Sequence, residues 1–72
     1  MATYDEFQRA KDDGKVHDFS PRGPNGRAIR GRVVGRGVTR LSTADGGTER
    51  PWKIEDEQGK TYEVASDDYD ID

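Results

Sequence analysis

Six arginines lie between Phe19 and Ala44 with no acidic residue among them, and they are the side chains best suited to chemistry with a charged partner. They are Arg22, Arg27, Arg30, Arg32, Arg36 and Arg40. A guanidinium group binds phosphates and carboxylates through paired, charge-assisted hydrogen bonds. The block therefore predicts recognition of an anionic group.

The spacing of these arginines predicts a row on one face of a strand. Four of them occupy even positions: Arg30, Arg32, Arg36 and Arg40. The apolar residues that alternate with them occupy odd positions: Ile29, Val33 and Leu41. Alternate residues of a β-strand point to opposite faces, so a strand over 28–41 would separate the cations from these apolar side chains. Val34 and Val38 fall on the arginine face, which means that either a bulge near Gly35 shifts the register or both valines are partly exposed.

Three interpretations of the arginine row follow from the rest of the sequence. In the structural one, glutamates of the following hairpin pair across the strands with Arg30 and Arg32. These glutamates are Glu55, Glu57 and Glu63. In the functional ones, the row binds either an acidic protein or the phosphates of a nucleic acid. The net charge of −3 and a single candidate for an exposed aromatic side chain, Tyr69, weigh against non-specific binding to nucleic acid. The candidate binding residues are Arg27, Arg30, Arg32, Arg36 and Arg40.

The second charged cluster is the C-terminal segment 67–72. It holds Asp67, Asp68, Asp70 and Asp72. Carboxylate oxygens suit a hard cation, but the segment lacks the glycine and the terminal glutamate of an EF-hand loop. We therefore expect no metal site here, and instead a solvated tail or one that folds back over the arginines.

Side chains suited to catalysis are sparse. His17 is the only histidine and cysteine is absent, so a Cys–His pair and a thiolate metal site are excluded. The glycines are not followed by the Lys-Ser/Thr pair of a phosphate-binding loop. Paired catalytic carboxylates need a cleft, which so small a domain rarely builds. We expect a non-catalytic protein without a cofactor.

The length of 72 residues allows one small domain, expected over 1–72. Leu, Ile, Val and Phe number eleven, which limits the size of the core. No apolar run reaches the ~18 residues of a membrane span and no signal peptide is evident, so a cytoplasmic protein is expected. The charges are separated along the chain, because residues 19–44 carry +6 and residues 55–72 carry −7.

The first element expected is a helix over about 4–12. Thr3 and Glu6 have the spacing of a capping box, and Gly14 is suited to end the helix. A helix of this length is not stable alone, so its apolar side chains must dock on the rest of the chain. These are Tyr4, Phe7 and Ala10.

The remaining elements predict a small β-structure over about 16–66. A Pro/Gly-rich turn at 21–26 precedes the arginine strand, and alternation on both sides of 57–60 indicates a hairpin. Trp52 and Tyr62 fall on the inward face of that hairpin, which favours core packing over an aromatic cage for a methylated cation. The expected core is Phe7, Phe19, Ile29, Val33, Leu41, Trp52, Ile54, Tyr62 and Val64.

From Arg27 to Tyr69 the layout resembles an SH3-like or Tudor-like small antiparallel β-barrel. The resemblance is carried by the bent strand 29–34, the polar loop after it, the hairpin 52–64 and a short last strand at Tyr69. It implies a mainly β fold, to which the helix expected over about 4–12 is added, and it names no ligand. We expect a non-catalytic binding or accessory module that contacts an unidentified protein, in one version an acidic one, through the bent arginine strand or an open sheet edge. Binding to RNA or DNA is the alternative.

Overall fold

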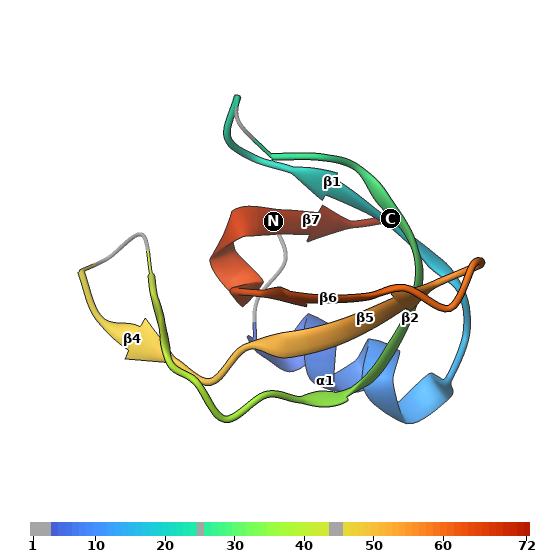
Figure 1. The fold of residues 1–72 in the computed structure, drawn as a ribbon, viewed down its shortest axis with the longest axis horizontal. Helices are drawn as coiled ribbons and strands as arrows, with labels where there is room; N and C mark the ends of the chain where they lie inside the picture. The colour runs from blue at the N-terminus through green and yellow to red at the C-terminus, as the bar shows by residue number, and fades with distance from the viewer. Residues whose placement is uncertain (1–3, 25, 44–45) are drawn as a thin grey trace.

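The computed structural model describes residues 4–24, 26–43 and 46–72. Within these ranges the chain is mainly β, with one short α-helix near the N-terminus, as predicted (Figure 1). The helix α1 (Tyr4–Asp13) is one residue longer than the 4–12 expected, and its cap residue Thr3 lies outside the described residues. The strands are β1 (His17–Pro21), β2 (Ile29–Arg36), β3 (Leu41–Ser42), β4 (Thr48–Glu49), β5 (Trp52–Asp56), β6 (Thr61–Val64) and β7 (Tyr69–Ile71), with a 3₁₀ helix, η1 (Ser66–Asp68), before the last one.

Five strands form one antiparallel sheet in the order β6-β5-β2-β1-β7. The hairpin predicted around 57–60 is the β5–β6 pair, in which Trp52 lies opposite Val64. The strands β3 and β4 form a separate two-stranded ribbon. In the described part of the chain β6 and β7 are not paired with each other, so the five-stranded sheet is open along these two edges.

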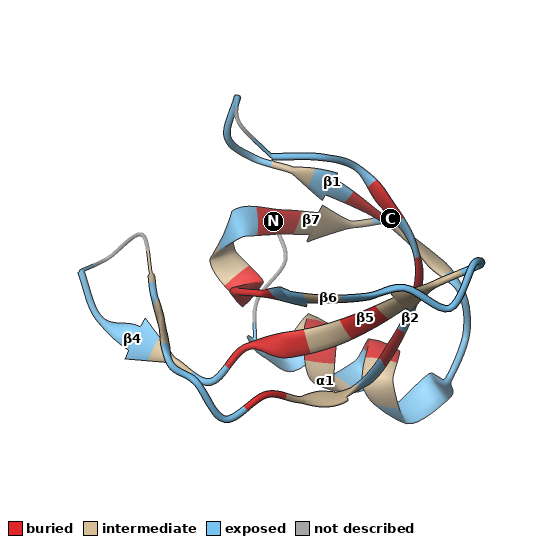
Figure 2. Cartoon of the chain, in the orientation of Figure 1, coloured by how far each residue is buried: buried red, intermediate tan, exposed pale blue. Residues whose placement is uncertain are grey.

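The core lies between α1 and the inner face of the sheet (Figure 2). Phe7 of α1 is fully buried, and its ring centroid is 5.7 Å from that of Phe19 and 5.6 Å from that of Trp52. The buried hydrophobic side chains are Phe7, Ala10, Phe19, Ile29, Val33, Trp52, Ile54, Val64, Ala65 and Tyr69. Most of the expected core is therefore confirmed, and Tyr62 packs against it while half-buried.

Two side chains differ from their predicted places. Tyr69, expected to be exposed, is only 8% exposed because β7 pairs with β1 and turns the ring toward the same face as Pro21. Leu41, expected in the core, is half-buried and belongs to the β3–β4 ribbon outside the core cluster. Both residues line a groove at the surface.

A β-bulge in β2 divides the arginine row. Val33 lies opposite Ile54, but the next paired residue is Gly35, opposite Lys53, so Val34 has no partner and remains 47% exposed. A bulge inserts one residue into one strand, and every side chain after it changes face. Arg36 consequently lies opposite Trp52 on the inner face of the sheet. Both alternatives offered for this segment hold, because the register shifts near Gly35 and Val34 and Val38 are exposed, whereas the predicted one-sided row of four arginines is wrong.

The C-terminal segment is part of the fold. It forms η1 and then β7, whose residues pair with β1 from Phe19 to Pro21. The backbone N–H of Asp72 also donates to the carbonyl oxygen of Asp18 at 3.2 Å. Among the helices of the described ranges, none is long and apolar enough to cross a membrane.

Candidate functional site

Arg30 and Arg32 lie on the outer face of β2, and both are held in ion pairs. Nη1 of Arg30 is 2.8 Å from Oδ1 of Asp18, and its Nε is 3.2 Å from Oε1 of Glu57. Nη2 of Arg32 is 3.5 Å from Oε1 of Glu55. The hydrogen bond from Arg30 lowers the pKa of Asp18, and the same contact raises the pKa of Arg30. The cross-strand pairing predicted with Glu55 and Glu57 is therefore present.

Glu63, the third glutamate expected to pair with these arginines, does not reach them. Its carboxylate lies against Gly37, where a Cβ atom would collide with it. The reason is the strand order. Glu63 lies on β6, where it pairs with Lys53 of β5, and β5 separates β6 from β2.

Arg36 is half-buried, and its guanidinium group contacts other parts of the chain. Its guanidinium carbon is 3.8 Å from the centroid of the Trp52 ring and 5.1 Å from that of Tyr4. Its Nη2 donates to the carbonyl oxygen of Arg50 at 2.8 Å, and its Nη1 to the hydroxyl of Tyr4 at 3.2 Å. A guanidinium used in this way has little capacity left for a ligand.

The other arginines are dispersed. Arg22 binds the C-terminal segment, since its Nη1 donates to the carbonyl oxygen of Asp67 at 2.9 Å and its Nε is 3.9 Å from Oδ1 of Asp70. The tail thus folds back onto Arg22, at the side of the predicted row. Arg27 and Arg40 are exposed, and neither forms an ion pair in the described part of the chain. The structure therefore does not bring the five candidate residues together into one surface.

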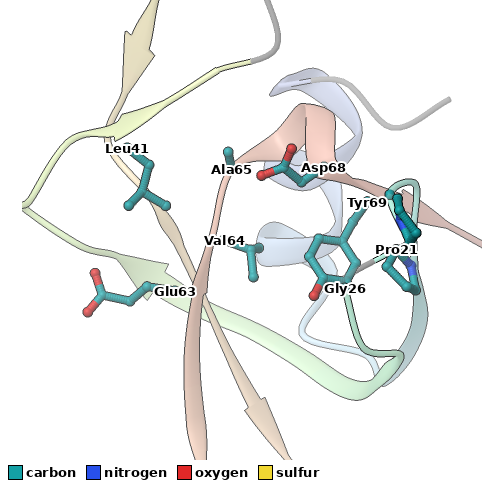
Figure 3. A pocket seen from close by; sticks show the side chains of 10 residues that line it. Pro21, Gly26, Leu41, Glu63, Val64, Ala65, Asp68 and Tyr69 are labelled. Atoms are coloured by element: carbon teal, nitrogen blue, oxygen red, sulfur yellow. The ribbon is translucent and has the colours of Figure 1, made fainter.

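A groove that the sequence did not indicate lies between the two edges of the sheet, and we call it the seam groove (Figure 3). Its volume is about 370 Å³. Pro21 and Gly26 of the β1–β2 segment form one wall, and Leu41 forms the other. Val64 and Ala65, at the end of β6, lie between these walls, together with Tyr69 of β7. The only sequence signal for this groove is the Pro/Gly-rich turn, which supplies a wall but does not reveal what faces it.

Hydrogen bonds from distant segments hold the seam groove in shape. The hydroxyl of Tyr69 donates to the carbonyl oxygen of Arg27 at 3.0 Å, which ties β7 to the segment before β2. Glu49 of β4 accepts from the backbone N–H and the hydroxyl of Ser66, at 2.8 and 2.9 Å. Arg22 donates its backbone N–H to the carbonyl oxygen of Asp68 at 2.9 Å. These bonds connect the segments that border the groove to one another in the folded chain.

The seam groove is acidic at its rim. Glu63 and Asp68 both line it, and neither carboxylate has a hydrogen bond or ion pair within the described ranges. Partial burial, followed by the charges of Asp67 and Glu49, raises the pKa of Asp68. An ionised Asp68 is thus less stable here than in water, and a cation placed beside it would offset this cost.

The other candidate functional sites, a histidine site and a metal site, have less structural support. His17 lies beside Asp13, with Nε2 3.1 Å from Oδ2, and has no nucleophile next to it among its described contacts. In the ranges that the structure covers, no group of three or more His, Cys, Asp or Glu side chains is arranged to hold a metal ion. Comparisons with protein-family models, with curated proteins and with solved structures find no match to this chain.

Proposed function

We propose that this protein is a small, non-catalytic protein-binding module and that its binding site is the seam groove. The observation that carries the proposal is the groove itself, where apolar side chains from three separate segments meet beside an unpaired sheet edge. Its volume of about 370 Å³ is near the lower end of ligand pockets, which suits a few side chains of a bound segment. Hydrogen bonds already connect the segments that border the groove, so we expect binding to require little ordering of the module.

We also infer an SH3-like arrangement for the sheet. Five antiparallel strands with a 3₁₀ helix directly before the last one, together with two sheet edges that meet at one groove, support this inference. Fold likeness by itself assigns no ligand, so the proposal of protein binding depends on the groove and not on the resemblance.

The arginine strand face is the weaker choice for the binding surface. Arg30 and Arg32 would have to exchange their carboxylate partners for a ligand, and Arg36 would have to leave the Trp52 ring. Among the described residues, Arg27 and Arg40 are the members of the candidate set whose guanidinium groups have neither an ion pair nor a ring contact. These observations favour the seam groove over both an acidic protein and a nucleic acid bound at the strand.

Amide chemical shifts of ¹⁵N-labelled protein, titrated with a pooled library of eight-residue peptides, test this proposal. We expect the shifts to be confined to Val64, Ala65, Tyr69 and their neighbours, and to be weakened by Leu41→Asp, which places a charge in the groove wall. Arg32→Glu, on the outer face, is the matched control and should leave them unchanged. Shifts centred on Arg30 and Arg32 would instead assign binding to the arginine strand.

A further inference from the structure

We propose that the partner segment binds in the seam groove as an extended strand added to the edge of β6, with an apolar residue adjacent to a lysine or arginine. This inference rests on the proposed function and specifies how the groove is used and by what chemistry. Three features support strand addition: the unpaired edge of β6 in the described part of the chain, the apolar floor of the groove and its acidic rim.

The backbone of β6 offers an unused hydrogen-bonding edge. In the described part of the chain β6 pairs with β5 alone, at the end of the sheet order. In an antiparallel ladder alternate residues direct their N–H and C=O groups toward opposite neighbours, so every second residue of β6 points these groups away from β5. Such an edge is a template for another strand. Glu63 and Val64 of β6 both line the seam groove, so an added strand would enter it.

The floor and walls provide places for apolar side chains. Val64 and Tyr69 are each only 8% exposed, yet both reach the groove surface between Pro21 and Leu41. Alternate side chains of an extended segment point in the same direction. One apolar side chain of the added strand would therefore pack against Val64, while its neighbours would point toward the rim.

The acidic rim of the groove favours positively charged side chains next to the apolar residue of the added strand. Glu63 and Asp68 line the groove, and within the described residues their carboxylates have no hydrogen bond or ion pair. Residues 55–72 carry a net charge of −7. A like charge opposite a carboxylate is unfavourable, whereas a lysine or arginine would be attracted to both groups. An acidic segment, the partner suggested by the arginines, does not suit this site.

The chain itself contains a segment of similar chemistry, which makes a second copy the main competing occupant. Val38 is 82% exposed and Arg40 is exposed without an ion pair in the described ranges. Reciprocal insertion of this segment would produce a dimer. We favour a different protein as the occupant because Leu41, next to this segment, already forms a groove wall in its own chain.

The test uses fluorescein-labelled eight-residue peptides of alternating valine and threonine, measured by fluorescence anisotropy. The first peptide carries a central lysine, the second a central glutamate, and the third is the lysine peptide with alternate backbone amides N-methylated. We expect the second and third peptides to bind about tenfold or more weakly than the first. Exchanging both rim charges, with Glu63→Lys and Asp68→Lys, should reverse the preference between lysine and glutamate. Because both side chains are exposed, this variant is expected to fold, which circular dichroism would verify.

The outcomes separate this inference from the proposed function. Equal binding of the methylated peptide would overturn strand addition, and equal binding of the glutamate peptide would overturn the charge preference, while groove-centred amide shifts would still support a protein-binding module. Absence of groove shifts with every peptide would overturn both. Sedimentation equilibrium of the free protein completes the test, because a dimer that is lost with Val38→Ser and Arg40→Ser would assign the groove to a second copy.

Discussion

The guanidinium group of Arg36 stacks on the ring of Trp52, with 3.8 Å between its central carbon and the ring centroid. Trp52 is fully buried, and the hydroxyl of Tyr4 in α1 accepts a hydrogen bond from the same arginine. The pair therefore joins β2, β5 and α1. An arginine that the sequence assigned to a binding face is instead half-buried and packs against a side chain of the core.

Replacing Arg36 should destabilise the fold. Arg36→Ala removes the stack on Trp52 and the hydrogen bond to the carbonyl oxygen of Arg50, so we expect a loss of about 1–2 kcal/mol in the free energy of unfolding. Arg36→Lys should also be destabilising, because an ammonium group cannot reproduce the planar stack. Urea unfolding followed by Trp52 fluorescence and far-UV circular dichroism measures the change. Arg32→Ala is the control in the same strand and should change stability by less than about 0.5 kcal/mol; equal effects of the two would contradict the packing role.

Two glycines of β2 should respond differently to alanine. A Cβ atom at Gly31 would collide with the backbone carbonyl of Glu55 on β5, whereas one at Gly35 would meet nothing within 4 Å. We expect Gly31→Ala to lower the free energy of unfolding by about 1–3 kcal/mol, as overpacking does. Gly35→Ala should be neutral or slightly stabilising, since it restricts the unfolded chain. Thermal unfolding of both variants checks this, and a neutral Gly31→Ala would show that β2 and β5 are further apart than described.

Much of the fold could be predicted from local patterns. The helix followed from a cap, an apolar spacing and Gly14, and the β5–β6 hairpin from alternation around 57–60, because such signals act over a few residues. The face on which Arg36 lies could not be predicted from such local signals. A bulge shifts the register by one residue, and sequence pattern marked its neighbourhood through Gly35 without fixing which side chains change face.

The seam groove could not be predicted from the sequence for a different reason. Its lining comes from the segments around Pro21, Leu41 and Tyr69, which are far apart in the chain and meet only in the folded structure. Tyr69 alone illustrates the difficulty. In an acidic tail it suggested exposure, but the pairing of β7 with β1 and its hydrogen bond to the Arg27 carbonyl bury it.

Asp56 should make the β5–β6 hairpin sensitive to acid. Its Oδ1 accepts from the backbone N–H groups of Lys60 and Gln58, both at 2.9 Å, and these bonds, chiefly the one from Lys60, lower its pKa below the usual 3.8. A carboxyl group whose pKa is lower in the folded state stabilises the fold above its unfolded pKa, and this contribution is lost as the pH falls through the folded pKa. We expect Asp56→Asn to be less stable than the unmodified protein at pH 7 and the difference to shrink below about pH 4. Urea midpoints measured from pH 7 to pH 3 test this, and a constant difference would exclude the ionised carboxylate as the cause.

The protein should bind nucleic acid only weakly. Arg30 and Arg32 are paired with Asp18, Glu57 and Glu55, and the whole chain carries −3, so few cations are available to release counterions from phosphates. We therefore expect the protein to leave a heparin column below about 0.15 M salt, near the physiological ionic strength.

A variant with Glu55→Gln and Glu57→Gln is the informative comparison, since it removes two carboxylates from the arginine face and leaves the arginines in place. It should be retained to higher salt than the unmodified protein, because Arg32 and one side of Arg30 become available. Strong retention of the unmodified protein that falls steeply with salt would show that the ion pairs yield to phosphate. In that case the arginine strand, and not the seam groove, would be the functional surface.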